Sequence, residues 1–518
     1  MPQSHEIVPD IIRFWSEQAP DRVALIDDTG AISYGVLHRR SNQVANRLLE
    51  IGIRPGSHIS YLGMNSTGFF DAWLAAGKIG CAFAPFNWRL VPAELAEIME
   101  DAAPAIIFVD AAFNEKIQAV WALTSFRCEV VCFDSKLNEG GLKKWAEQAA
   151  DRDPDLSRTA SDACLLAYTS GTTGRPKGVV LSHGAIKHSF LSAAREPAMS
   201  WTSDDCILFS MPNFHLGGSC VALQALYNGG RLSIVPNFET ATALRRIPRD
   251  RVTIMPLVPA ALQMILDSPA LKSADLSSLR NIMYFGSAIG AETVRRACEL
   301  VGCNLVQHYG TTETWIITIL RPEDHDVTRP ARLASCGLPV PFVKIRVVDA
   351  VGNDVERSTV GQVLVQSPTT FSGYLNQPEA TSAVMQNGWY TTGDLGFVDG
   401  DGYLTLVDRA KDMIVSGGEN VYSVEVERAL FRHPAVSIAA VIGTPDPKWG
   451  EKVTAFVVPT PGASVTAEEL KRHCRDLLAG YKVPKEIWVE DALPMTANGK
   501  VQKATLRKKC WMAVRSLD

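Results

Sequence analysis

The sequence has no excess of positive charge, no long apolar run and no C-x-x-C cysteine pair. Its formal net charge is −5, which gives no basic surface of the kind that nucleic-acid-binding proteins present. No stretch of about 18 apolar residues occurs, and the first residues show no cationic segment followed by an apolar core. The eleven cysteines are scattered, which argues against a zinc site or a disulfide framework. We therefore expect a cytoplasmic protein with reduced, mostly buried thiols, no integral membrane span and no nucleic-acid partner.

The length and the apolar periodicity predict more than one domain. A chain of 518 residues exceeds what one hydrophobic core usually organises. Helical spacing over residues 34–52 is followed by short β-rich runs at 58–63 and 105–110, an alternation typical of parallel sheets covered by helices. After residue 337 short strands and frequent turns predict a β-rich subdomain. We expect an α/β fold, with a large N-terminal domain over residues 1–408 and a small mobile α+β domain over residues 409–518.

Residues 168–184, YTSGTTGRPKGVVLSHG, follow a predicted strand and are rich in glycine and hydroxyl groups. Such glycines let backbone N–H groups converge, and the lysine at 177 adds positive charge, so the loop suits phosphate oxygens. The lysine follows Gly174 by three positions, and Gly178 stands where a Walker A loop has Ser or Thr. A P-loop nucleotide triphosphatase is therefore disfavoured, and the loop alone does not exclude an ordinary turn.

Two further segments carry groups that suit a nucleotide. Residues 309–313, YGTTE, end a predicted strand with an aromatic ring that could stack on a base and a carboxylate suited to a hard cation. Residues 390–396, YTTGDLG, place Asp394 on a predicted turn, where its carboxylate suits the vicinal hydroxyls of a ribose.

The C-terminal part contains two segments with cations beside glycines. Residues 408–421, DRAKDMIVSGGENV, hold Arg409 and Lys411 just before a glycine pair. Residues 494–507, PMTANGKVQKATLR, put Lys500 on an Asn-Gly turn, from which it could reach into the site of another domain.

With these five motifs in order along nearly the whole chain, the sequence resembles the adenylate-forming superfamily of acyl-CoA synthetases, luciferases and peptide-synthetase adenylation domains. The resemblance implies an ATP-dependent acyl-CoA synthetase that uses ATP, Mg²⁺ and coenzyme A. A carboxylic acid and ATP would give acyl-AMP and pyrophosphate, and the CoA thiol would then give acyl-CoA and AMP.

The resemblance also implies which residues bind the nucleotide. The phosphate loop would be Thr169, Ser170, Gly171, Thr172, Thr173, Gly174 and Lys177. The adenine would lie along Gly286, Ser287 and Ala288 and stack on Tyr309, Thr312 would bind phosphate, and Gly310 and Thr311 would belong to the same nucleotide-binding segment. The sequence GSAIG at 286–290 differs slightly from the more usual Gly-Gly-Ala of the family. Asp394 and Arg409 would bind the ribose.

By the same resemblance, the catalytic residues would be Lys500, Thr312, Glu313 and His215. Glu313 would hold Mg²⁺, with Thr169 near the metal. The small domain would rotate about Lys411 between the two half-reactions. Gly417 and Gly418 would then line the tunnel for the pantetheine arm of CoA.

The acid is expected to be apolar, either fatty or aromatic. His215 matches a gate position beside the acyl pocket of relatives, and residues 214–216 contain no carboxylate to pair the amine of an amino acid. Candidates for the pocket lining are Leu216, Val258, Phe285 and Trp315. Medium- or long-chain fatty, aryl and sterol-derived acids all remain open.

Several alternatives remain open at this stage. Lys500 could be one more solvated cation, Asp394 could only cap its turn, and Glu313 could cap a helix that follows Thr311 or Thr312. Tyr309 and His215 could be purely structural. The alternative function is a stand-alone adenylation enzyme that loads a carrier protein, and a homodimer is one option for the assembly.

Overall fold

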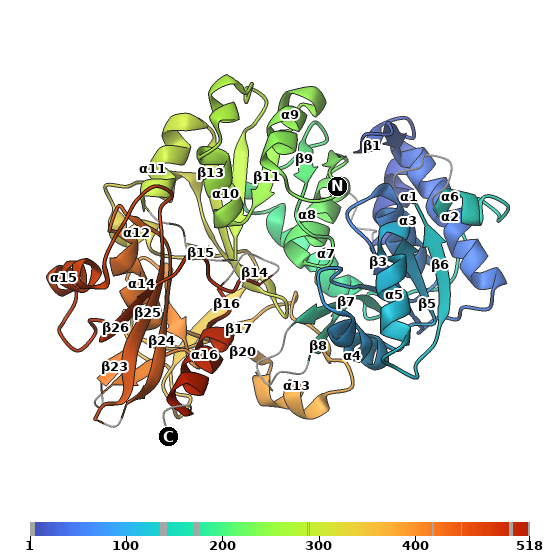
Figure 1. Cartoon of the computed structure of the whole chain (residues 1–518). Helices are drawn as coiled ribbons and strands as arrows, with labels where there is room; N and C mark the ends of the chain where they lie inside the picture. The colour runs from blue at the N-terminus through green and yellow to red at the C-terminus, as the bar shows by residue number, and fades with distance from the viewer. Residues whose placement is uncertain are drawn as a thin grey trace.

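The computed structural model describes residues 6–134, 142–169, 176–286, 289, 291–416, 419–446, 448–496 and 501–515. Its described residues form two large sheets, a smaller antiparallel sheet and a C-terminal sheet, shown in Figure 1. The helices are α1 (Pro9–Gln18), α2 (Tyr34–Glu50), α3 (Thr67–Lys78), α4 (Pro92–Ala102), α5 (Asn114–Trp121), α6 (Leu142–Ala146), α7 (His183–Ala193), α8 (Leu216–Tyr227), α9 (Thr240–Asp250), α10 (Pro259–Leu266), α11 (Ala291–Leu300), α12 (Pro330–Leu333), α13 (Pro378–Val384), α14 (Ser423–Phe431), α15 (Ala467–Leu477) and α16 (Lys503–Arg515).

Both large sheets have parallel centres; antiparallel strands lie at one edge of the first sheet and at both edges of the second. The first sheet has the order β18 (Gly373–Tyr374), β8 (Lys177–Ser182), β7 (Ala163–Thr169), β4 (Ala82–Pro85), β3 (His58–Leu62), β5 (Ile106–Asp110) and β6 (Glu129–Phe133). The second has the order β15 (Leu338–Pro339), β14 (Trp315–Leu320), β13 (Asn304–Thr311), β12 (Asn281–Phe285), β11 (Ile254–Leu257), β9 (Cys206–Phe209), β10 (Arg231–Ile234), β1 (Val23–Ile26) and β2 (Ala31–Ser33). The α/β fold class predicted from the alternating periodicity is confirmed.

The two smaller sheets are predominantly antiparallel. The β-rich subdomain contains β16 (Lys344–Val348), β17 (Gly361–Gln366), β20 (Trp389–Val398), β19 (Met385–Gln386) and β21 (Leu404–Arg409). The C-terminal sheet contains β23 (Glu419–Val421), β22 (Ile414–Ser416), β25 (Gly450–Pro459), β24 (Val436–Asp446) and β26 (Glu486–Val489). Figure 1 shows the C-terminal sheet and its helices in orange to red, beside the β-rich subdomain.

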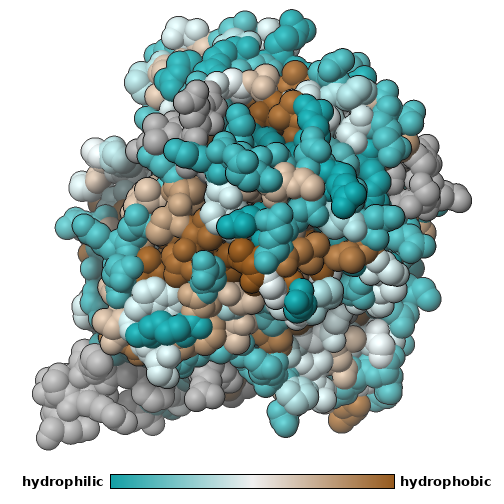
Figure 2. Space-filling view, turned by 90° about the vertical axis from the view of Figure 1, so that its right-hand side faces the viewer, coloured by the Kyte–Doolittle hydropathy of each residue, from teal (hydrophilic) through white to brown (hydrophobic). Residues whose placement is uncertain are grey.

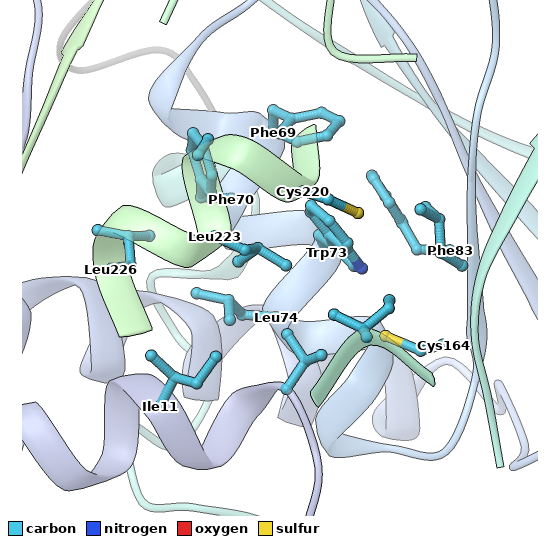
Figure 3. Packing of buried hydrophobic residues seen from close by; sticks show 14 of the residues in the cluster. Ile11, Phe69, Phe70, Trp73, Leu74, Phe83, Cys164, Cys220, Leu223 and Leu226 are labelled. Atoms are coloured by element: carbon cyan, nitrogen blue, oxygen red, sulfur yellow. The ribbon is translucent and has the colours of Figure 1, made fainter. Parts of the chain in front are cut away.

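Helix α3 packs between the two large sheets, which explains why it is apolar on almost every face. The ring of Phe70 lies 5.4 Å from that of Phe209 in the second sheet, and Trp73 stacks on Phe83 of the first at 6.0 Å. Figure 3 shows Phe70, Trp73 and Phe83 together with side chains of α8, such as Leu223. Because α3 contacts strands of both sheets, the two sheets share one core and form one large structural unit.

The eleven cysteines are free thiols, as the scattered spacing predicted. Six are buried: Cys81, Cys164, Cys206, Cys220, Cys336 and Cys474. Burial raises the pKa of the Cys220 thiol to about 12, so this thiol stays protonated and packs as a small apolar side chain.

The surface contains apolar as well as hydrophilic regions. Figure 2 shows a band of apolar residues crossing the face at the right of Figure 1, with hydrophilic residues on both sides of it. Among the described residues, every helix is too short or too polar to cross a lipid bilayer.

Residues 408–412 connect the β-rich subdomain to the C-terminal sheet. The carboxylate of Asp408 accepts a hydrogen bond from the hydroxyl of Ser423 at 3.0 Å, at the start of α14. The N–H groups of Asp412 and Met413 both donate to the carbonyl of Arg409, which closes a turn with the exposed Lys411 inside it. The domain boundary and the hinge role of Lys411 stay predictions, although this turn is a short connection of the expected kind.

Candidate active site

Tyr309, Asp394 and Arg409 meet at one point, although they come from different strands. The Tyr309 hydroxyl donates to one carboxylate oxygen of Asp394 at 2.6 Å, and Arg409 Nε lies 2.6 Å from the other. Asp394 is 4% exposed. Strands β20 and β21 place Asp394 directly opposite Arg409, so the ion pair is a cross-strand pair. The three residues that the resemblance assigned to the nucleoside therefore form one cluster.

Burial and nearby charges shift the pKa values of Tyr309 and Arg409 in this cluster. Burial, together with the Asp394 carboxylate, raises the pKa of Tyr309 well above its usual range, so its hydroxyl remains a donor. Burial by itself would lower the pKa of Arg409, but the charges of Asp394 and of the neighbouring Tyr309, Tyr390 and Asp412 together raise it. The cluster is a fixed acceptor between two protonated donors.

The prediction that Asp394 lies on a turn is wrong, because the residue is inside strand β20. The residue before it, Gly393, has φ of +75°, in the left-handed region that glycine adopts easily. The Asp394 N–H donates to the hydroxyl of Thr392 at 3.0 Å. A glycine beside Thr and Asp is typical of a turn, but here it marks a local irregularity in a strand that continues.

Glu313 lies in the tight turn between β13 and β14. Its backbone carbonyl accepts from the N–H of Phe371 at 2.7 Å, and one carboxylate oxygen accepts from the Tyr374 hydroxyl at 2.7 Å. The alternative that Glu313 caps a helix is wrong, since the chain turns directly into β14. Thr312, in the same turn, is half-buried.

The turn requires an unusual backbone on both of its sides. A side chain at Gly310 would place its Cβ 1.9 Å from the carbonyl oxygen of Trp315, so only glycine fits there. Trp315 itself has φ of +62°, a strained value for a bulky residue. Its side chain lines a small, largely apolar cavity with Met199 and Ile319. The turn therefore holds Glu313 at one end and directs an aromatic ring into the interior at the other.

The chemistry of this turn fits a magnesium ion. The Glu313 carboxylate is a hard oxygen donor of the type that Mg²⁺ prefers, and threonine hydroxyls lie beside it in the sequence. Within the described ranges, no three His, Cys, Asp or Glu side chains are grouped to hold a metal by themselves. A magnesium ion at Glu313 would therefore take further ligands from phosphate and water, as is usual for this ion.

The two ends of the predicted phosphate loop lie side by side. Thr169 ends β7, Lys177 begins β8, and the two residues are opposite one another in the antiparallel pair. The Lys177 ammonium lies 4.7 Å from the centre of the Tyr374 ring. Ser170, Gly171, Thr172, Thr173 and Gly174 lie outside the described residues, and their roles stay predictions.

The remaining predicted residues are placed only in part. Gly286 is exposed at the end of β12 with φ of +95°, whereas Ser287 and Ala288 lie outside the described residues. Gly417, Gly418 and Lys500 also lie outside the described residues, and their roles stay predictions.

His215 precedes α8 and is half-buried, with its ring 4.5 Å from that of Phe214. The ring of Phe285 packs against Gly217 of α8, close to the buried Leu216. These contacts bring three predicted pocket residues to one region of the second sheet, while their role in binding the acid stays a prediction.

Sequence reasoning missed two tyrosines at this site. Tyr374 donates to Glu313, which is 61 positions earlier in the chain. The Tyr390 hydroxyl lies against Glu313 and Thr311, and burial together with the Glu313 charge raises the pKa of Tyr390. Tyr390 was part of a quoted motif but was given no role. A Gly-Tyr pair within SPTTFSGYLNQP carries no local signal of a contact so far away.

Comparison with known proteins supports the same assignment over nearly the whole chain. The family model described as AMP-binding enzyme matches residues 12–375, and the model described as AMP-binding enzyme C-terminal domain matches residues 425–500. A feruloyl-CoA synthase from Amycolatopsis sp. is 36% identical over 495 residues, 95% of this chain and 97% of the relative. An indoleacetate–CoA ligase from Aromatoleum aromaticum is also 36% identical, over 94% and 95% of the two chains.

Two further similarities extend the comparison. The fatty acid–[acyl-carrier-protein] ligase ScoC from Streptomyces coeruleorubidus is 32% identical over 96% of this chain and 95% of its own. The crystal structure of ATP-bound MatB from Rhodopseudomonas palustris superposes with a TM-score of 0.88 at 30% identity, covering 97% of this chain and 99% of that one. The chain therefore belongs to the AMP-binding enzymes of the adenylate-forming superfamily and is an AMP-forming acid–thiol ligase.

Proposed function

We propose that this enzyme activates an aromatic monocarboxylic acid with ATP and transfers the acyl group to coenzyme A. In the first step a carboxylate oxygen attacks the α-phosphorus of ATP, and pyrophosphate leaves. In the second step the sulfur of CoA attacks the acyl carbon, AMP leaves, and the thiol proton passes to solvent. Both first-step reactants are anions, so the site must offset their mutual repulsion.

One observation carries the proposal: the residues proposed to bind the nucleoside and the metal of a nucleoside triphosphate lie on one hairpin. Tyr309 and Glu313 are four positions apart on the β13–β14 hairpin. The Tyr309 hydroxyl donates to Asp394, the carboxylate proposed to bind the ribose, and Glu313 is the carboxylate proposed to bind the metal. Lys177, at the start of β8 in the other large sheet, contacts the ring of Tyr374, and the hydroxyl of Tyr374 donates to Glu313. A nucleoside placed on the first group would extend its phosphates toward the second.

The residues of the chain divide the chemistry between them. Tyr309, Asp394 and Arg409 bind and orient the nucleoside, and Lys177 provides a positive charge near the phosphates. A magnesium ion, when bound, supplies further positive charge there. Lys500 is the candidate for bridging the acid and the α-phosphate, which is a positioning and electrostatic role that needs no proton transfer.

Two facts favour an aromatic acid. The relatives at 36% identity are named for feruloyl and indoleacetate substrates, both aromatic. In this chain, Phe285 and Phe214 surround the start of α8 near His215, so the expected acyl region is rich in rings. Aromatic rings pack well against a flat aryl substrate.

The test is a panel of acids that includes ferulate, indole-3-acetate and decanoate, each assayed for ATP- and CoA-dependent formation of AMP and acyl-CoA. We expect equal amounts of AMP and acyl-CoA and the highest kcat/KM with an aromatic acid. Formation of only ADP and phosphate would refute the reaction. A consistent preference for alkyl acids of every length would refute the substrate class alone.

A carrier protein is the second candidate acceptor, because the relative ScoC is named for one. The same panel, run with a phosphopantetheinylated acyl-carrier protein in place of CoA, decides between them. Faster acyl transfer to the carrier protein than to CoA would replace CoA in the proposal and leave the adenylation step unchanged.

A further inference from the structure

Tyr374 lies between the two loops to which the proposed function assigns the phosphates and the metal. The Lys177 ammonium is 4.7 Å from the centre of its ring, and its hydroxyl donates to Glu313 at 2.7 Å. Tyr374 is only 8% exposed. One side chain therefore contacts both a cation at the end of the phosphate loop and the carboxylate expected to bind magnesium.

The backbone around Tyr374 is held on both sides. Strand β18 pairs with β8, so that Tyr374 lies opposite Val179, two residues after Lys177. The Tyr374 N–H donates to the hydroxyl of Thr381 at 2.9 Å. These bonds position the ring independently of Glu313.

The same short segment also holds the Glu313 turn from the other side. The Phe371 N–H donates to the carbonyl of Glu313 at 2.7 Å, and the Thr369 hydroxyl donates to the carbonyl of Thr314 at 2.6 Å. The N–H of Ser372 donates to Val180 in β8 at 2.8 Å. Residues 369–374 thus connect the strand that leaves the phosphate loop with the turn that carries Glu313.

The contacts of Tyr374 suit a permanent donor. The Tyr374 hydroxyl is an O–H donor, and its 2.7 Å bond to the Glu313 carboxylate is a hydrogen bond to a charged acceptor. A carboxylate that accepts such a bond has its orientation restricted, which prepares it to bind a cation.

We propose that Tyr374 is a positioning residue that fixes the Glu313 carboxylate for the magnesium ion and, through its ring face, fixes Lys177 for the phosphates. This role rests on the proposed function, because it concerns the ATP site of that reaction. The two halves of the role are separable: the hydroxyl acts on Glu313, and the ring acts on Lys177.

Two variants separate these halves. Tyr374→Phe keeps the ring under Lys177 and removes the hydroxyl, whereas Tyr374→Leu removes both. The probe is Mn²⁺, titrated against the enzyme with saturating ATP and followed by electron paramagnetic resonance, which reports binding without turnover. Thermal unfolding of each variant checks that it is folded.

We expect Tyr374→Phe to weaken Mn²⁺ binding about tenfold, the usual effect of removing a partner of a metal ligand, with the KM for ATP at saturating Mg²⁺ nearly unchanged. Tyr374→Leu should weaken Mn²⁺ binding similarly and also raise the KM for ATP, because Lys177 loses its ring contact. Weakened Mn²⁺ binding in Tyr374→Leu together with a normal KM for ATP would overturn the proposed action of the ring on Lys177.

Tyr403 offers a matched control. Its hydroxyl donates to Asp324 at 3.1 Å, and the Arg332 guanidinium lies 3.3 Å from the centre of its ring, so it has the same two kinds of contact at a different place. Tyr403→Phe should bind Mn²⁺ as the wild type does, and an equal loss there would overturn the proposal. Unchanged Mn²⁺ binding in Tyr374→Phe would overturn the role of Tyr374 alone, whereas a wild type unable to bind Mn²⁺ with ATP would overturn the proposed function.

Discussion

Asp394 provides the sharpest test of the nucleoside site. In Asp394→Asn the side chain keeps its shape and one oxygen, but an amide NH₂ now faces either Tyr309 or Arg409. One charge-assisted bond is lost, which is worth about 1.5–3 kcal/mol. Because the Arg409 side chain is 46% exposed and can be solvated, we expect the lower half of that range, about 1.5–2 kcal/mol, as the loss in unfolding free energy.

The same substitution should affect ATP binding more specifically. A ribose hydroxyl would lose its charged acceptor, so we expect the KM for ATP to rise about 10- to 100-fold, the equivalent of one hydrogen bond to a charged group. The assays are acid-dependent ATP–pyrophosphate exchange for the KM and urea unfolding for stability.

Asp354→Asn is the matched control, because Asp354 pairs with Arg346 Nε at the same 2.6 Å but on the exposed surface of the same subdomain. It should change neither the KM for ATP nor, beyond a few tenths of a kcal/mol, the stability. An Asp394→Asn enzyme with a normal KM for ATP would refute the assignment of this cluster to the nucleoside.

Three further predictions concern other parts of the chain. Gly310→Ala should abolish ATP–pyrophosphate exchange and lower the Tm, because the new Cβ would lie 1.9 Å from a backbone oxygen. Gly400→Ala is the control and should do neither, because nothing lies within 4 Å of its Cβ. Normal exchange in Gly310→Ala would contradict the geometry of the turn. Lys500→Ala should abolish adenylation but largely spare thioester formation from added acyl-adenylate. Lys411→Pro should spare adenylation and impair thioester formation, because proline fixes φ at the proposed hinge. Equal loss of both steps in either variant would count against domain rotation. Burial lowers the pKa of Lys78 to about 7, so above pH 7 the unfolded chain binds one more proton than the folded chain, and stability rises with pH. Relative to Lys78→Met, the wild-type unfolding free energy in urea titrations should rise by up to about 1.4 kcal/mol between pH 7 and pH 8. Parallel pH dependences of the two proteins would disprove this.

The alternation of helices and strands was predictable because it is written in local periodicity. Strands such as β3 and β5 are short apolar runs between amphipathic helices, and parallel centres follow from that order. The five motifs were equally visible, since a phosphate loop or a Tyr-Gly-Thr-Thr-Glu segment depends on neighbouring residues. The family that they indicated is confirmed by similarity over nearly the whole chain.

Reasoning from local sequence was wrong at a glycine that is compatible with both a turn and an irregular strand. Gly393 beside Asp394 was interpreted as a turn, but pairing with β17 and β21 keeps this segment extended. Hydrogen bonds to two neighbouring strands outweigh the local preference of Thr-Gly-Asp for a turn. The same competition explains why Glu313 lies in a hairpin rather than at the start of a helix.

The sequence by itself therefore determined the family of this protein, the order of its motifs and the residue types that we propose bind the nucleotide. Only the tertiary structure decided which of these residues meet. Asp394 reaches Tyr309 across 85 positions, and Tyr374 reaches both Glu313 and Lys177 from a segment with no motif of its own. Such contacts depend on how sheets from distant parts of the chain pack, and packing leaves no periodic signal in the residues that it brings together.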